Sequence, residues 1–140
     1  MDTIYPIRIK RIYDTPLASD GLRILVDRLW PRGVPKKRTQ VDEWMKEVAP
    51  STELRQWFAH TPERYPVFSA LYERELLEDP LHIAMLMRLK ELHANNALTL
   101  LYSAKNEHQN HAQVLLRVLQ RVCSIDTTPV VRQDQIVPSK

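Results

Sequence analysis

Glycine is nearly absent from this chain, with two glycines, Gly21 and Gly33, among 140 residues. A glycine-rich phosphate loop needs several glycines close together, and so does the dinucleotide-binding fingerprint. The scarcity also excludes a collagen repeat and a flexible Gly/Ser linker. An anionic ligand of this protein must therefore be held by side chains or by the amides of a helix N-terminus.

Cysteine and long apolar runs are also scarce. A single cysteine, Cys123, cannot form an internal disulfide, which favours a reducing compartment. No uninterrupted apolar stretch approaches the roughly 18 residues that cross a bilayer. The first residues lack the basic and apolar regions of a signal peptide. We therefore expect a cytoplasmic protein that does not associate with membranes.

The remaining composition is that of an ordinary globular chain. Apolar residues make up 44% and charged residues 26%, which argues against disorder. Twenty Lys and Arg against 17 Asp and Glu give a net charge of +3. This slight excess favours anionic partners, but it is far from the dense basic field of a duplex-binding protein.

Three segments have the patterns of β-strands. Residues 4–12 alternate apolar and basic side chains, as in a half-exposed strand, and residues 22–29 are apolar and β-branched. Residues 98–102 are continuously apolar, which is typical of a strand buried on both faces of a parallel sheet. Turn residues at Ser19-Asp20-Gly21 separate the first two strands.

Helical spacing dominates the rest of the chain. We expect a short helix from Thr39 or Asp42 to Val48, several helices up to Ala94, and a last one that Gln109 or Asn110 caps. The order of elements predicts an α/β fold: a single three-layer domain with a small, mostly parallel sheet flanked by helices. That domain spans residues 1–125, and residues 126–140 form a C-terminal tail or edge strand.

Ligands of such sheets bind outside the carboxyl ends of the strands, so the loop after Leu29 is the first candidate site. Arg28 and Arg32 can grip one phosphate or carboxylate bidentately, and Asp27 can hold one of them in place. Trp30 can wall the site or stack on a flat ligand, although core packing is the commoner fate of tryptophan. A local ion pair between Asp27 and Arg28, beside a solvated Arg32, is the alternative.

The loop after residue 102 is the second candidate. Lys105, Glu107, His108 and His111 place a cation, an acid and two bases directly after a buried strand. The dipole of the following helix disfavours the charged form of His111, which suits a general acid or base near neutral pH. Ser103 lacks the glycine-flanked turn of a nucleophilic serine. A plain polar loop with two surface histidines is the alternative.

Metal and cofactor sites are not expected. His108 and His111 with Glu107 offer three possible ligands, but a zinc site needs a fixed geometry and a further ligand pair. The other histidines are scattered over the expected helices. Cys123 ends an apolar helix face, where a thiol is usually an inert core residue.

Several of these segments together resemble the YeaO-like family of small bacterial proteins, a domain of unknown function. The resemblance covers about residues 7–120, and the segments that carry it are Gly21 to Gly33, Asp42-Glu43-Trp44, Ala49-Pro50-Ser51, Leu54-Arg55-Gln56-Trp57-Phe58 and Leu100 to Lys105. It implies a compact three-layer α/β domain in the bacterial cytoplasm, with Asp27, Arg28, Pro31, Arg32, Lys105 and His111 at the centre of its pattern. More distant relatives have Cys-His-Arg where this chain has Asn110-His111-Ala112.

Three functions remain open from the sequence. The first is a small enzyme or binding domain for an anionic ligand, in which Arg28 and Arg32 hold the anion and His111 and Lys105 assist. The second is a nucleic-acid-binding module that uses basic residues of the first strand and of the segment after the arginine loop, namely Arg8, Lys10, Arg11, Lys36, Lys37 and Arg38. The third is a non-catalytic interaction domain with an acidic face at residues 73–79.

Overall fold

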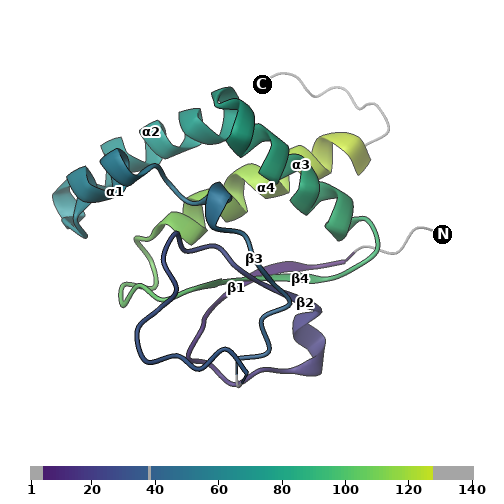
Figure 1. Cartoon of the computed structure of the whole chain (residues 1–140). Helices are drawn as coiled ribbons and strands as arrows, with labels where there is room; N and C mark the ends of the chain where they lie inside the picture. Colours follow the sequence, from purple (N-terminus) through teal and green to yellow (C-terminus); the bar gives the residue numbers. More distant parts are fainter. Residues whose placement is uncertain (1–4, 38, 128–140) are drawn as a thin grey trace.

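The fold is a four-stranded, all-parallel sheet with α-helices packed on one face (Figure 1). The computed structural model describes the backbone of residues 5–37 and 39–127 and the side chains of 5–37 and 39–123. The strand order is β1-β4-β2-β3. The strands are β1 (Ile7–Arg11), β2 (Leu22–Leu25), β3 (Glu43–Trp44) and β4 (Leu98–Tyr102).

Strand β4 lies at the centre of the sheet and every one of its residues is buried. Leu100 pairs with Ile9 of β1 on one side and with Ile24 of β2 on the other. A continuous apolar run suits this position because both faces of the strand are covered. The α/β fold and the buried parallel strand expected at residues 98–102 are therefore confirmed.

Within the described residues the α-helices cover one face of the sheet, and the opposite face is covered by the 3-10 turn η1 (Ala18–Asp20) and by the loop between β2 and β3 (Figure 1). The third layer of the domain therefore consists of a short turn and loops instead of long helices. In chain order the helical elements are η1 (Ala18–Asp20), η2 (Lys46–Val48), α1 (Thr52–Phe58), η3 (Pro62–Arg64), α2 (Tyr65–Glu78), α3 (Pro80–His93) and α4 (His111–Thr127).

Two apolar cores lie on the two sides of the sheet, because neighbouring strand residues point to opposite faces. Ile24 and Leu100 pack beneath the helices in the larger core. Leu25 and Leu101 point the other way into a smaller core with Ile12, and partly buried side chains of the loop layer pack against it, namely Trp30, Val34, Val41 and Trp44. The loop layer, which consists of η1 and the loop between β2 and β3, is thus held to the sheet by hydrophobic contacts of its own.

The helix expected from Thr39 or Asp42 to Val48 is wrong. This segment forms the short strand β3 and then the 3-10 turn η2. The Asp42 side chain does not cap a helix, because its Oδ2 accepts the backbone N–H of Arg23 at 2.8 Å. The backbone N–H of Met45 continues the pairing by donating to Leu25. Pairing with a neighbouring strand, which local helix signals do not reveal, decided this segment.

The end of the chain is described only in part. Helix α4 continues to Thr127, two residues into the segment that we assigned to a tail or edge strand. Residues 128–140 lie outside the described residues. Cys123 is buried in the larger core, and burial raises the pKa of its thiol, as expected of an inert core residue.

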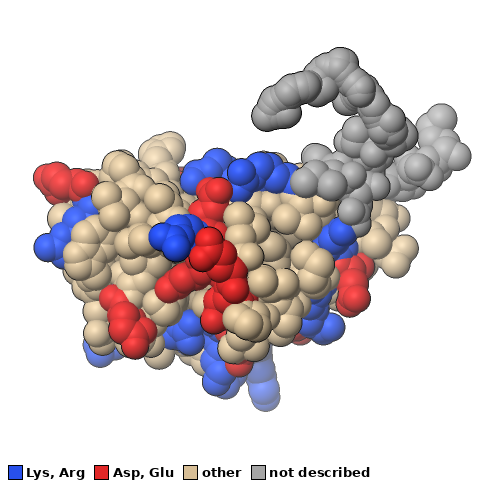
Figure 2. Space-filling view, turned by 90° about the horizontal axis from the view of Figure 1, so that it is seen from above, with Lys and Arg blue, Asp and Glu red and all other residues tan. Residues whose placement is uncertain are grey.

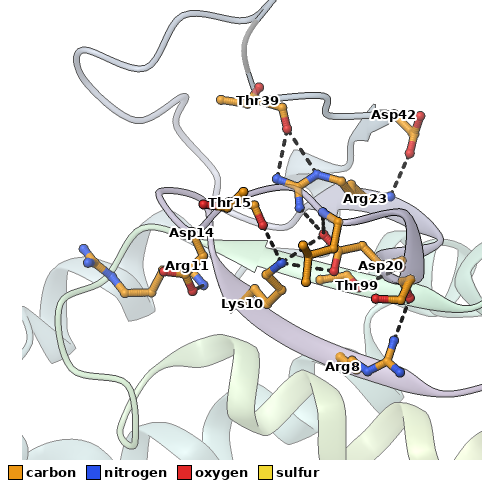
Figure 3. A network of polar contacts seen from close by, with 12 residues as sticks. Arg8, Lys10, Arg11, Asp14, Thr15, Asp20, Arg23, Thr39, Asp42 and Thr99 are labelled. Carbon is orange, nitrogen blue, oxygen red and sulfur yellow. Dashed lines mark hydrogen bonds and ion pairs between the residues drawn. The ribbon is translucent and has the colours of Figure 1, made fainter.

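A buried ionic network ties η1 to the sheet and to the loop layer (Figure 3). Asp20 is 2% exposed, and its carboxylate accepts from Lys10 of β1 at 3.0 Å and from Arg23 of β2 at 2.5 Å. The Arg23 guanidinium also donates twice to the carbonyl of Thr39. Thr99 of β4 donates its hydroxyl to the carbonyl of Asp20 at 2.7 Å.

Acid should weaken this network. Burial by itself raises the pKa of Asp20, but hydrogen bonds from Leu17, Lys10 and Arg23 outweigh it and hold the pKa below the ordinary value of 3.8. A depressed pKa contributes stability above pH 3.8, and this contribution is lost as the pH falls towards the folded-state value. We expect Asp20→Asn to lower the free energy of unfolding by about 3 kcal/mol at neutral pH. Urea denaturation from pH 3 to 7 measures both effects, and parallel acid profiles for the two proteins would contradict the role of Asp20.

The two glycines differ in what they tolerate. Gly21 has φ +67°, and a Cβ there would lie 2.2 Å from the carbonyl oxygen of Ala97, whereas Gly33 has φ +72° and no atom within 4 Å of its Cβ position. Gly33→Ala should therefore cost only the backbone strain of about 1 kcal/mol. We expect Gly21→Ala to cost at least about 3 kcal/mol more, because the backbone itself must move. Chemical denaturation of the two variants measures the difference, and equal losses would contradict it.

Candidate functional site

A cavity of about 670 Å³ opens at the carboxyl ends of β2 and β4. Its walls come from the loops after these two strands, from Ala49 and Pro50, and from α1 and α2. Seven residues of the two candidate loops line it, namely Asp27, Arg28, Trp30, Arg32, Ser103, Lys105 and His111, whereas Glu107 and His108 of the second loop are exposed and lie outside the lining. The topology brings the two loops together because β2 and β4 are adjacent and parallel.

Asp27 joins the two loops. Its Oδ2 accepts the hydroxyl of Ser103 at 2.6 Å and the backbone N–H of the same residue at 3.2 Å. Its backbone carbonyl accepts the indole N–H of Trp44 at 2.8 Å. The carboxylate therefore holds Ser103, whereas we expected it to hold an arginine. The Ser103 hydroxyl therefore donates its hydrogen to a residue of the protein itself.

His111 is the first residue of α4, whose N-terminus is capped by the side chain of Asn110. The ring Nε2 lies 3.1 Å from the carbonyl of Val26 and 3.3 Å from Oδ1 of Asp27. A carbonyl only accepts, so Nε2 carries the hydrogen, and the neutral ring has its lone pair on Nδ1. Oδ1 of Asp27 is buried and accepts no hydrogen bond, so it acts on His111 through its charge alone.

Arg28 has a structural task. Its Nε donates to the carbonyl of Pro50 at 3.0 Å and its Nη2 to that of Ala49 at 3.1 Å. Neither bond uses Nη1. Arg28 therefore lines the cavity and at the same time fixes the backbone that forms one of its walls.

The same wall is held from the helices, by residues that the sequence did not suggest. Tyr72 of α2 donates its buried hydroxyl to the carbonyl of Val48 at 2.6 Å, and burial raises its pKa well above the usual value. His82 of α3 lies between the carbonyl of Ala49 and Oδ2 of Asp79, at 2.8 Å from each. The hydrogen bond from His82 lowers the pKa of Asp79. Only contacts between distant segments define these roles.

Arg32 and Lys105 are the exposed cations of the cavity, and neither forms a hydrogen bond or ion pair with another described residue. Arg55 and His60, on or just after α1, also line the cavity, and we did not predict them. The Nε of Arg55 is buried and has no hydrogen-bond acceptor. A signal for Arg55 existed, since it lies within the segment Leu54 to Phe58 that carries the family resemblance.

Trp30 forms the boundary between the cavity and the smaller core. Its indole N–H donates to the carbonyl of Val34 at 2.7 Å, and its ring meets Trp44 edge-on at 5.5 Å. Lys36 lies over the same ring at 5.4 Å. We expected Trp30 either to wall the site or to pack in the core, and it does both: it packs on the smaller core and also lines the cavity.

Strand β1 directs its basic side chains towards acceptors of the protein. Arg8 donates to the carbonyl of Ser19, Lys10 pairs with Asp20, and the Arg11 guanidinium donates to the carbonyls of Ser103 and Ala104. On the face that carries the helices, Asp and Glu gather near the middle and Lys and Arg lie around them, so the described residues of this face form no continuous basic patch (Figure 2). Within the described residues, no three His, Cys, Asp or Glu side chains are grouped as metal ligands, and no helix is long and apolar enough to span a membrane.

The two arginines of the first loop should respond differently to truncation. Arg28→Ala removes two hydrogen bonds and takes the donor from the carbonyl of Pro50, whereas the carbonyl of Ala49 keeps its contact with His82, so we expect a loss of about 2 kcal/mol in the free energy of unfolding. Arg32→Ala removes an exposed side chain and should change it by less than about 0.5 kcal/mol. Urea denaturation of both variants makes the comparison. A stable Arg28→Ala variant would mean that the wall does not depend on this residue.

Comparison with known proteins identifies relatives along most of the chain. A family model described as the inactive DUF488-N3 subclade matches residues 6–132. "Uncharacterized protein YeaO" of Escherichia coli (strain K12) is 50% identical over 109 residues, which cover 78% of this chain and 92% of that protein. "Uncharacterized protein Rv3073c" of Mycobacterium tuberculosis (strain ATCC 25618 / H37Rv) is 38% identical over 113 residues, which cover 81% and 92%. No solved structure matches the chain.

Proposed function

Because this chain belongs to the inactive DUF488-N3 subclade and is similar to the uncharacterized protein YeaO, we propose that it is a non-catalytic domain that binds a small anionic ligand in the cavity at the ends of β2 and β4. The family description favours binding without turnover. The geometry agrees with this preference, because the Ser103 hydroxyl is hydrogen-bonded to Asp27 and Nε2 of His111 is directed at a backbone carbonyl.

The charge of the cavity carries the proposal. Four cationic side chains line it, and among the described lining residues Asp27 is the single carboxylate. That carboxylate is occupied on one oxygen by Ser103 and buried on the other. The excess positive charge therefore has no counterpart on the cavity wall, and it suits a phosphate or carboxylate group of a ligand. The four cations are Arg28, Arg32, Arg55 and Lys105.

Each polar residue has a separate task in this proposal. Arg32 and Lys105 reach the anion from the two opposing loops, since neither is held by other described residues. Arg28 contributes its Nη1 while its other donors hold the wall. His111, which we expected to transfer protons, lines the cavity, where the lone pair on Nδ1 can accept a hydrogen bond from a donor group of the ligand. An enzymatic role of His111 and Lys105 remains a prediction from the sequence.

Nucleic acid is less well supported as the ligand. Three of the six cations on which that alternative depends, Arg8, Lys10 and Arg11, are engaged by carbonyls and by Asp20. Lys36 and Lys37 are exposed, and Arg38 lies outside the described residues. The acidic face at residues 73–79 is likewise partly engaged. Glu73 pairs with Arg121 at 2.8 Å, and both oxygens of Glu75 accept from Ser51.

Anion titration at constant ionic strength tests the proposal. We expect inorganic phosphate to raise the melting temperature of the wild-type protein, because a ligand that binds the folded state stabilises it. Arg32→Ala and Lys105→Ala should each weaken phosphate binding about tenfold, as measured by calorimetry, since each removes a charge-assisted contact.

Matched variants provide the control. Arg117→Ala and Lys37→Ala also remove exposed cations, but outside the cavity lining. They lower the net charge equally and should leave the dissociation constant unchanged. If all four variants weakened phosphate binding equally, the overall charge of the protein would explain the binding, and a site in the cavity would be refuted.

A further inference from the structure

We infer that the ligand of this cavity is an amphipathic organic anion, with an apolar body attached to its phosphate or carboxylate group. This inference rests on the proposed function for its anionic part. The apolar part rests on a different observation, the hydrophobic lining between the cations. If the inference holds, a bare inorganic ion is not the ligand that the cavity fits best.

Size is the first argument. A volume of about 670 Å³ lies within the roughly 300–1,000 Å³ of pockets that hold organic ligands and cofactors. An inorganic phosphate that contacts Arg32 and Lys105 would leave most of this space to water. The exposed apolar part of the lining, Leu29 above all, would then remain hydrated and add nothing to affinity.

The chemistry of the wall is the second argument. Phe58 of α1 and Phe68 of α2 line the cavity, and their rings stack at 4.3 Å with an interplanar angle of 19°. Ala49 and Pro50 continue this surface, and their backbone is fixed by Arg28 and His82. A rigid apolar wall loses little entropy when a hydrophobic group packs against it.

Leu29 is the third argument. It lines the cavity between Arg28 and Trp30, yet it is 61% exposed, so core packing does not account for an apolar residue here. A ligand body that reaches from the phenylalanines towards the loop would cover part of this side chain. Burial of apolar surface of that kind strengthens binding roughly in proportion to the area removed from water.

A matched pair of phosphonates tests the inference, because the two differ in the apolar body and cannot be hydrolysed. Calorimetry of the full chain with methylphosphonate and phenylphosphonate, at a pH where both are dianions, should show phenylphosphonate binding about tenfold tighter. Leu29→Ser should weaken phenylphosphonate about threefold and leave methylphosphonate unchanged. Leu17→Ser is the control, since Leu17 is 56% exposed and lies outside the cavity lining.

The outcomes separate the two proposals. Equal affinities for the two phosphonates would overturn the inference and leave the anion site intact. Phenol binding as tightly as phenylphosphonate would overturn the anion site instead. An equal effect of Leu29→Ser on both phosphonates would show that the apolar body does not reach this residue and would also count against the inference. The loss expected for phenylphosphonate alone, with Leu17→Ser unaffected, would support it.

Discussion

The architecture of the site depends on the carboxylate of Asp27. Its hydrogen bonds to Ser103 hold together two loops that lie 76 residues apart in the sequence. The backbone carbonyl of Asp27 accepts the indole N–H of Trp44, and the second carboxylate oxygen, Oδ1, lies beside Nε2 of His111. One residue thus connects the loops that follow β2 and β4 with β3 and with the start of α4. A cavity between two loops has a defined shape only when such a contact exists, since loops are otherwise the more mobile parts of a fold.

The two arginines of one short motif have separated into two tasks. Arg28 faces backbone carbonyls and keeps the wall of Ala49 and Pro50 in place, whereas Arg32 stands exposed with no described partner. The guanidinium suits the first task because its planar fork binds two adjacent acceptors in one geometry. Because the wall is already ordered and carries cations at its rim, a ligand can gain charge and hydrophobic contacts without the entropy loss of ordering the protein.

Local patterns predicted most of the fold and only part of the site. The buried strand at β4, the cap of α4 by Asn110 and the turn that ends at Gly21 follow from the chemistry of each segment. The short strand β3 does not, since its pairing with β2 outweighs a local preference for helix. Residues after parallel strands were correctly expected at one edge of the sheet. His82 and Tyr72 were not foreseen, because their roles depend on a wall contributed by a distant segment.

The central position of β4 also determines when the protein can fold. Among the described strands, β1 pairs only with β4, and β2 pairs with β4 and with the two-residue strand β3, so most of this sheet has no hydrogen-bonding partner until residues 98–102 exist. On the ribosome, roughly the first hundred residues must therefore wait for the strand that completes the sheet. Such non-local pairing slows folding, because a long loop must close before the contacts form. The exposed apolar strands of this intermediate are the point at which the nascent chain is most open to chaperones and to aggregation.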